Sequence, residues 1–247
     1  MTGPTAKLAA IDVALLAGGL GTRIQGVLGD VPKVLAPIHG RPFLEHVVDW
    51  LAGFGTRRLV LCLGHLAGKV TDHLAARPPG RVELVPVVEP EPLGTKGALV
   101  FARHALTSDP VLVLNGDSFL EADLAGFAAR HAAAAAAVSL LCVEVPDAGR
   151  YGRVEADADG YVVRFAEKDT GQSGPGLINA GLYLFSAAML DRLAALPGPS
   201  LERDVLQKLP PGTIRVEVAR GPFIDIGTPQ SLMDAPGIIP DDRRQPR

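Results

Sequence analysis

The sequence has only two cysteines, little net charge and no long apolar run. Its 247 residues include 24 Lys and Arg against 27 Asp and Glu, a formal charge of −3. Such weak acidity offers no basic surface, so neither nucleic acid nor an anionic membrane is expected as a partner. Cys62 and Cys142 each lie within an apolar run, and we expect two buried free thiols rather than a disulfide.

No apolar run approaches the roughly 18 residues that a membrane span needs. The first apolar stretch is short and interrupted by glycines, which argues against a signal peptide. We therefore expect a soluble, cytoplasmic protein. The histidines show neither metal-ligand spacing nor a nucleophile partner, and no role is assigned to His39, His46, His65, His73, His104 or His131.

Apolar runs of strand length alternate with segments of helical pattern in the first part of the chain. Asp123 is placed to cap the helix that precedes the fifth strand. Continuous apolar strands separated by helices predict an α/β fold, with a Rossmann-like, mixed but mostly parallel central sheet and helices on both faces. The expected strands are residues 10–18, 57–64, 81–89, 110–118 and 138–145, and the expected helices are residues 43–55, 67–79, 95–106 and 124–137.

The pattern changes after residue 146. Residues 151–168 predict a hairpin that turns at the segment DADG. A strand over 178–186 and a helix over 187–196 follow, and residues 213–227 are expected to close the sheet. Because no linker interrupts the pattern, we expect one domain over residues 1–235 and a flexible tail over residues 236–247.

A glycine-rich stretch over residues 15–37, LLAGGLGTRIQGVLGDVPKVLAP, follows the first strand. A loop between a strand and a helix offers free N–H groups to phosphate, and glycine lets the backbone approach a ligand. A dinucleotide-binding loop needs glycine where Ile24 stands and an acid after the second strand, and both are missing. A Walker-type loop needs G-x-x-x-x-G-K-[ST], which is also absent. A glycine turn with solvated cations at Arg23 and Lys33 is the remaining alternative.

The same stretch resembles the signature of the sugar-1-phosphate nucleotidyltransferases, also called nucleoside-diphosphate-sugar pyrophosphorylases. LAGGLGTR and then PKVLAP match the family pattern G-G-x-G-T-R…P-K. The resemblance continues in family order through EPLGTKGAL, LNGDS, YGRV, FAEK, INAG and FIDIGTP, and so covers about residues 10–235. Within the family, the sequence is most similar to the D-glycero-D-manno-heptose 1-phosphate guanylyltransferase group. Two departures are IQGVLGD, in place of a short apolar-proline stretch, and Lys96, where small residues are common.

The resemblance implies the nucleotide-diphospho-sugar transferase fold, with residues 10–145 mainly for the nucleotide and residues 146–235 mainly for the sugar. The implied reaction is attack by a sugar 1-phosphate on the α-phosphorus of a nucleoside triphosphate, releasing pyrophosphate. A phosphate monoester is already a competent nucleophile at pH 7, so positioning and charge stabilisation matter more than a general base.

The resemblance also implies a role for individual residues. Arg23 would hold the β- and γ-phosphates, and Lys33 would bridge the α-phosphate and the sugar phosphate. The sugar phosphate would be bound by Gly116, Gly152, Glu167, Lys168 and Asn179. The implied nucleotide-binding residues are Leu16, Ala17, Gly18, Gly19, Gly21, Thr22, Glu89, Leu93, Gly94, Thr95 and Asn115.

Two aspartates are candidate metal ligands. Asp117 follows an apolar strand, and Asp225 stands between two isoleucines, where a carboxylate is costly unless it is paired or metal-bound. Two carboxylates at one strand-end edge suit Mg²⁺, which completes its shell with phosphate and water. The structural alternative for each aspartate is a carboxylate that caps a nearby loop.

Glu89 is a candidate for reading the base, because uridylyl- and thymidylyltransferase relatives often carry glutamine at its place. An ionised carboxylate only accepts hydrogen bonds, and guanine presents two adjacent donors, N1–H and the N2 amino group. GTP is therefore the favoured donor. The alternative is a solvated Glu89, with the backbone around Leu16, Ala17 and Gly94 reading the base.

Other functions stay open on the sequence. They are a hexose-1-phosphate uridylyl-, thymidylyl- or adenylyltransferase, a mannose-1-phosphate guanylyltransferase, and a non-catalytic nucleotide-binding regulatory module. The last should have lost a catalytic cation or a metal carboxylate, and all are present. The sequence does not determine the sugar, the pathway or the oligomeric state. A homo-oligomer is one of the oligomeric states that it leaves open.

Overall fold

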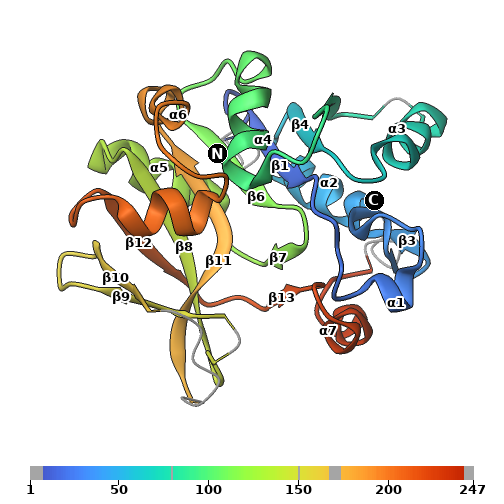
Figure 1. Cartoon of the computed structure of the whole chain (residues 1–247). Coiled ribbons are helices and arrows are strands. Elements are labelled where there is room, and N and C mark those ends of the chain that lie inside the picture. Colours follow the sequence, from blue (N-terminus) through green and yellow to red (C-terminus); the bar gives the residue numbers. More distant parts are fainter. Residues whose placement is uncertain (1–7, 79, 150, 167–173, 242–247) are drawn as a thin grey trace, which may run out of the picture.

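The computed structural model describes residues 8–78, 80–149, 151–166 and 174–241. Its centre is a seven-stranded sheet with the strand order β12-β8-β11-β6-β1-β4-β5 (Figure 1). Within this described sheet β11 alone runs antiparallel to its neighbours, so the predicted mixed, mostly parallel sheet is confirmed. The strands are β1 (Val13–Ala17), β4 (Arg58–Leu63), β5 (Glu83–Val88), β6 (Val111–Asn115), β8 (Val138–Val145), β11 (Gly176–Phe185) and β12 (Ile214–Ala219).

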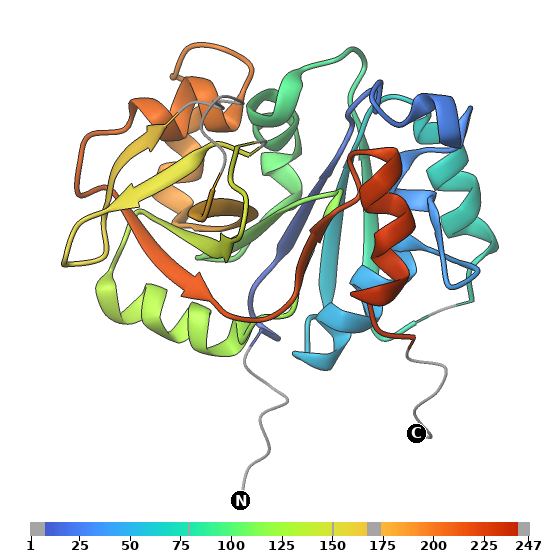
Figure 2. The ribbon, with the colours of Figure 1, turned by 90° about the horizontal axis from the view of Figure 1, so that it is seen from below.

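Helices cover both faces of this sheet, as Figure 2 shows. Side chains alternate between the two faces of a strand, so Val13 and Leu15 enter one apolar cluster and Ala14 the other. The first cluster is closed by α2 (Phe43–Gly53), α3 (Ala67–Ala76) and α5 (Leu124–Ala134), and the second by α4 (Gly94–Phe101) and α6 (Ala187–Leu193). The predicted two-faced arrangement is confirmed.

Among the described residues, no helix is both long and apolar enough to cross a bilayer.

Shorter elements complete the described fold. The short elements are α1 (Gln25–Leu28), η2 (Lys33–Leu35), β2 (Pro37–Ile38), β3 (Arg41–Pro42), η3 (Ala102–Ala105), β7 (Ser118–Leu120), β9 (Arg153–Ala156), β10 (Val162–Ala166), the π-helical η4 (Leu201–Val205), η5 (Leu206–Lys208), β13 (Phe223–Asp225), α7 (Pro229–Asp234) and η6 (Ala235–Gly237).

Several local predictions are confirmed. The Asp123 side chain accepts a hydrogen bond from the Gly126 N–H at 2.8 Å and so caps α5. Strands β9 and β10 form the expected antiparallel hairpin. In its turn, an Asp157 oxygen accepts from the N–H of Tyr161 at 2.8 Å. Both cysteines are buried free thiols.

The segment that was expected to close the sheet is split in two, which corrects that prediction. Its first part, β12, is the edge strand beside β8. Its second part, β13, leaves the sheet and pairs antiparallel with β7, so that Asp225 lies opposite Ser118. The chain turns between them at Gly221, where a Cβ would collide with the carbonyl oxygen of Glu121. This pairing places Asp225 beside the loop that carries Asp117.

The prediction of a flexible tail from residue 236 is wrong for residues 236–241. Ile239 is 2% exposed and belongs to the same apolar cluster as α2. Its carbonyl oxygen lies 2.9 Å from Nε2 of His39. Burial of this isoleucine holds the segment against the domain despite its proline- and charge-rich neighbours. Residues 242–247 lie outside the described part.

Candidate functional site

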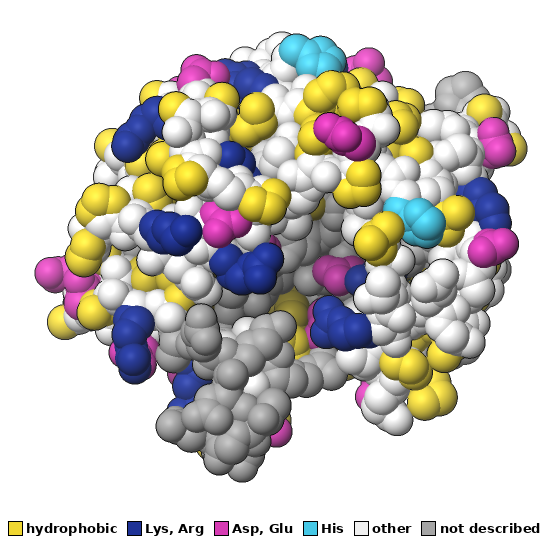
Figure 3. All heavy atoms as spheres, viewed as in Figure 1, with side chains coloured by type: hydrophobic (Ala, Val, Ile, Leu, Met, Phe, Trp, Pro, Cys, Tyr) yellow, Lys and Arg dark blue, Asp and Glu magenta, His cyan; other side chains and the backbone are white. Residues whose placement is uncertain are grey.

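A cavity of about 360 Å³ opens where β1, β4, β5 and β6 end. Ligands of open α/β sheets collect at the carboxyl ends of parallel strands, and this volume suits a small molecule. Figure 3 shows a hollow near the middle of this face, in which acidic and basic side chains meet. The cavity therefore lies where the sequence places a nucleotide.

The fold brings most of the predicted nucleotide-site residues to this cavity. Thr22, Arg23 and Leu93 do not line the cavity, and neither do Gly152, Asn179 and Asp225 from the predicted sugar and metal sets. Glu167 and Lys168 lie outside the described residues. The predicted residues that line the cavity are Leu16, Ala17, Gly18, Gly19, Gly21, Lys33, Glu89, Gly94, Thr95, Asn115, Gly116 and Asp117.

The glycine-rich loop forms one wall. It leaves β1 at Gly18 and turns at Gly21, whose φ of 61° lies in the left-handed region that favours glycine. The segment IQGVLGD, which differs from the family pattern, contains α1. Its Gln25 and Leu28 line the cavity together with Leu20. None of these three side chains was predicted. Gln25 and Leu28 lie where the sequence departs from the family pattern, and Leu20 occupies the unspecified position of G-G-x-G-T-R.

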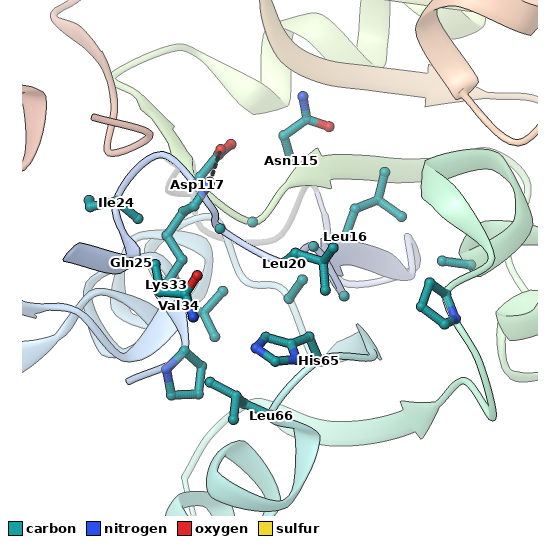
Figure 4. A pocket seen from close by; sticks show the side chains of 18 of the residues that line it. Leu16, Leu20, Ile24, Gln25, Lys33, Val34, His65, Leu66, Asn115 and Asp117 are labelled. Atoms are coloured by element: carbon teal, nitrogen blue, oxygen red, sulfur yellow. Dashed lines mark hydrogen bonds and ion pairs between the residues drawn. The ribbon is translucent and has the colours of Figure 1, made fainter. Parts of the chain in front are cut away.

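Lys33 and Asp117 form an ion pair at one side of the cavity. Lys33 Nζ donates to Asp117 Oδ2 at 2.9 Å, and the side chains are 19% and 27% exposed (Figure 4). Lys33 opens η2, and Asp117 follows the end of β6. The fold thus holds the predicted catalytic lysine and a predicted metal ligand in direct contact.

The second predicted metal ligand lies next to this pair. The Ile226 N–H donates to the Asp117 carbonyl oxygen at 2.8 Å, which ties the segment after β13 to the loop after β6. A Cβ built on Gly227 would lie 2.8 Å from Asp225 Oδ1, 3.5 Å from Arg23 Nη2 and 3.8 Å from Asp117 Oδ2. Both carboxylates and the predicted catalytic arginine therefore lie close together beside Gly227.

This donor set fits Mg²⁺. Two aspartate oxygens suit an ion that keeps several water or phosphate ligands. In the described part of the chain no three His, Cys, Asp or Glu side chains gather as a complete protein cage. A metal held by these two carboxylates would depend on further ligand oxygens, as Mg²⁺ bound with a triphosphate does.

Glu89 lies half-buried in the cavity wall at the end of β5. Its Oε2 accepts a hydrogen bond from the Leu93 N–H at 3.3 Å. Burial raises the pKa of the carboxyl group, and the Leu93 hydrogen bond opposes that shift more weakly. The side chain is thus fixed at the cavity, which differs from the solvated alternative considered for it.

A polar cluster stands beyond Asn115, toward the second half of the chain. Asn115 Nδ2 and the Tyr183 hydroxyl both donate to Oε1 of Glu202, at 3.4 and 3.2 Å. The Thr95 hydroxyl donates to Oε2 of the same glutamate at 3.3 Å. Tyr183 is fully buried, and burial together with the Glu202 charge raises its pKa well above the usual value. Glu202 was not predicted, because its partners are remote in sequence.

Asn179 belongs to the same cluster. Its Nδ2 donates to the Tyr183 hydroxyl at 2.8 Å, and its Oδ1 accepts from the Gly181 N–H at 2.8 Å. Gly152, with a φ of 82°, follows Tyr151, whose ring contacts Phe223 of β13 at 5.9 Å between centroids. Asn179 thus lies on β11, and Gly152 lies next to a residue that contacts the strand of Asp225.

Two further residues are explained by the structure. Lys96, a departure from the family pattern, points away from the cavity, because its Nζ donates to the Leu196 carbonyl oxygen at 2.5 Å. His65, to which no role was assigned, lines the cavity after β4 (Figure 4). The backbone N–H of His65 donates to the Gly18 carbonyl oxygen at 3.2 Å. The position of His65 follows from strand order, which a lone histidine in the sequence does not reveal.

Comparisons with known proteins identify the family of this chain. The sequence model described as nucleotidyl transferase matches residues 13–241. The D-glycero-alpha-D-manno-heptose 1-phosphate guanylyltransferase of Campylobacter jejuni is 30% identical over 220 residues, which cover 89% of this chain and 96% of the relative. The protein of the same name from Aneurinibacillus thermoaerophilus is 31% identical over 230 residues, covering 91% and 96%.

A solved structure shows the same architecture. The crystal structure of HddC from Yersinia pseudotuberculosis superposes with a TM-score of 0.81 at 34% identity, and the match covers 92% of this chain and 98% of HddC. HddC has also been solved in complex with GMP-PN. The family match spans almost all of the described fold, including each wall of the cavity. The chain therefore belongs to the nucleotidyl transferase family.

Proposed function

We propose that this chain transfers a guanylyl group from GTP to a sugar 1-phosphate, with D-glycero-α-D-manno-heptose 1-phosphate as the favoured acceptor. The products are a GDP-sugar and pyrophosphate, which makes the chain a cytoplasmic enzyme of nucleotide-sugar biosynthesis. The names of the two similar guanylyltransferases and the GMP-PN complex of HddC support the donor and the acceptor. The observation that carries the proposal is a fixed carboxylate, Glu89, in the same cavity as the Lys33–Asp117 pair.

In the proposed reaction an oxygen of the sugar phosphate attacks the α-phosphorus of GTP. The bond from that phosphorus to the oxygen bridging the α- and β-phosphates breaks, and pyrophosphate leaves with the electron pair. Two anions must meet, so fixed cations lower the barrier by offsetting charge. Lys33 would contact the α-phosphate and the acceptor phosphate, Arg23 the leaving phosphates, and the N–H groups of the glycine loop with Thr22 the triphosphate.

Asp117 and Asp225 would hold Mg²⁺. When bound, this ion supplies positive charge to the phosphate oxygens. The two carboxylates converge from β6 and β13, next to Arg23. Lys33 is paired with Asp117, so the lysine would lie at the edge of the proposed phosphate site.

Glu89 would select the base. Its carboxylate would accept from N1–H and the N2 amino group of guanine. Adenine and cytosine each place an acceptor beside their amino group, and uracil has a single N–H between two carbonyl groups. A mismatched buried polar contact costs about 1–3 kcal/mol, which corresponds to a preference of roughly 5- to 150-fold. Leu16, Ala17 and the start of α4 would contact the remaining faces of the nucleoside.

The second half of the chain, residues 146–235, would bind the sugar phosphate. We assign this role to Gly152, Asn179, Glu167 and Lys168, together with Gly116 after β6. A carboxylate and a carboxamide suit sugar hydroxyls, and a lysine suits the anomeric phosphate. The support within the described residues is the position of Asn179 in the polar cluster that extends from Asn115 through Glu202 and Tyr183.

Pyrophosphate release over a grid of nucleoside triphosphates and sugar 1-phosphates tests this function. We expect the highest kcat/KM for GTP with D-glycero-α-D-manno-heptose 1-phosphate in the presence of Mg²⁺. Higher turnover with mannose 1-phosphate would show that the heptose phosphate is not the preferred acceptor. A preference for UTP or dTTP would show that GTP is not the preferred donor. No Mg²⁺-dependent pyrophosphate release from any pair would contradict the proposal as a whole.

A further inference from the structure

Three neighbouring parallel strands end side by side at the cavity. Ala17 pairs with Leu63, and Leu63 pairs with Val88, so the residues that follow β1, β4 and β5 are Gly18, Gly64 and Glu89. The Glu89 N–H still donates to the Leu63 carbonyl oxygen at 2.8 Å. The backbone of Glu89 is therefore fixed relative to Gly64.

The Glu89 side chain lies across the ends of these strands. A Cβ on Gly64 would collide with Oε1 of Glu89 and lie 3.0 Å from its carboxyl carbon. A Cβ on Gly18 would lie 3.0 Å from the same Oε1. The other oxygen, Oε2, accepts from the Leu93 N–H. One carboxylate oxygen is thus held by a backbone donor, and the other occupies space that exists because residue 64 has no side chain.

The requirement for glycine at position 64 is one of space. Its φ lies outside the left-handed region, so an L-residue can adopt the same backbone conformation. Gly94 differs, because its φ of 73° favours glycine whatever the neighbours are. The main effect of a side chain at position 64 is therefore a steric clash with its neighbours, and the nearest neighbouring atom is Oε1 of Glu89.

We propose that Gly64 is a positioning residue for base selection. By leaving the space beside β4 empty, it lets the Glu89 carboxylate lie where both oxygens reach the donor edge of guanine. Hydrogen bonds weaken steeply with distance and angle, so displacing this carboxylate weakens its bidentate contact. This inference rests on the proposed function, in particular on Glu89 as the reader of the base.

The test is Gly64→Ala, with Gly68→Ala as the matched control. Gly68 lies four residues further along in α3, and a Cβ there would meet no atom within 4 Å. Calorimetry with Mg²⁺ gives the dissociation constants of GDP and UDP, and kinetics give kcat/KM for GTP and UTP. We expect Gly64→Ala to lower the preference for guanine at least about fivefold and Gly68→Ala to leave it unchanged. An unchanged preference in Gly64→Ala would overturn the inference.

A second comparison separates this role from a general structural one, because a Cβ on Gly64 would also lie 2.9 Å from the Gly18 carbonyl oxygen. In a Glu89→Ala background, Gly64→Ala should not change the base preference further. Thermal unfolding should show the double variant to be at least as stable as Gly64→Ala alone, because the collision with the carboxylate is gone. A further change in preference, or a double variant that fails to fold, would overturn the inference.

The wild-type protein distinguishes failure of the inference from failure of the proposed function. If the wild type binds GDP and UDP equally, the assignment of Glu89 to the base is wrong. If the wild type prefers GDP and Glu89→Ala abolishes that preference, the proposed function stands. Retention of the preference in Gly64→Ala would then refute only the role of Gly64.

Discussion

Lys33 donates a hydrogen bond to Asp117 at 2.9 Å, which joins the strand-end loop of β6 to the segment that follows the glycine-rich loop. One partner is the cation that we assign to the α-phosphate, and the other is a carboxylate that we assign to Mg²⁺. In this pair each offsets the charge of the other. Under the proposed function a metal and phosphates would satisfy the two side chains separately, and the pair would lie between the metal and phosphate sites.

Replacing Lys33 should stop the reaction and preserve the fold. Removal of a preorganised cation from developing phosphate charge commonly lowers the rate by about 10²–10³. We expect this loss in kcat for Lys33→Met and for Arg23→Met, measured by pyrophosphate release, with circular dichroism unchanged. Lys208→Met, on a lysine that is 60% exposed and pairs with Asp204, serves as the control. Wild-type turnover in Lys33→Met would contradict the catalytic assignment.

Replacing either metal carboxylate should raise the Mg²⁺ requirement. Asp117→Asn and Asp225→Asn each keep the shape of the side chain and remove the charge that the ion prefers. We expect the Mg²⁺ concentration for half-maximal rate to rise steeply, with a lower maximal rate. Asp191→Asn, on an exposed aspartate paired with Arg103, should leave the Mg²⁺ dependence unchanged. Full activity after treatment with EDTA would remove the basis of the metal assignment.

Buried His131 should make the fold less stable at acidic pH. Its Nδ1 lies 2.8 Å from the Ser139 hydroxyl, and burial lowers its pKa, with a smaller opposing effect from Asp109. The unfolded chain then takes up this proton first, near the usual value of about 6.5. The free energy of unfolding should therefore fall as the pH drops below about 6.5.

Urea denaturation at several pH values tests this effect. We expect His131→Gln to flatten the acid limb of the stability profile, even if the variant is less stable overall. The exposed His104 provides the matched control, and His104→Gln should retain the wild-type slope. An unchanged slope in His131→Gln would show that another group carries the pH dependence.

Base selection should also depend on pH. Burial raises the pKa of Glu89, so its carboxylate takes up a proton at a higher pH than an ordinary glutamate. The protonated group donates from one oxygen and no longer matches two guanine donors. The preference for GDP over UDP, measured by calorimetry, should therefore fall as the pH is lowered toward the raised pKa. A preference that stays constant down to the usual glutamate range, about pH 4.3, would contradict this account.

The sequence predicted the central sheet well, because the sheet depends on local patterns of apolar residues. Apolar strands such as β1 and β6 are continuous, and the motifs that follow them end at one edge of a parallel sheet. The family resemblance assigned Glu89, Lys33 and Asp117 to the site, and all three line the cavity.

Contacts between remote segments could not be predicted in the same way. The pairing of β13 with β7 depends on a close approach at Gly221, and the glycine gives no hint of its partner Glu121. Glu202 lies in a π-helical turn and meets Thr95 and Asn115 only through the fold. Ile239 was assigned to a tail because its neighbours are prolines and charges, yet its own burial decides its place.

The central claim, that Glu89 gives this nucleotidyl transferase its preference for guanine, is tested most directly by one ratio. That ratio is kcat/KM for GTP divided by kcat/KM for UTP, measured in the wild type and in Glu89→Gln. A glutamine offers one donor and one acceptor, which suit the N3–H and a carbonyl group of uracil. We predict that the ratio falls roughly ten- to hundredfold in the variant, with UTP turnover maintained or raised. An unchanged ratio would contradict the account and would leave the base to be read by the backbone.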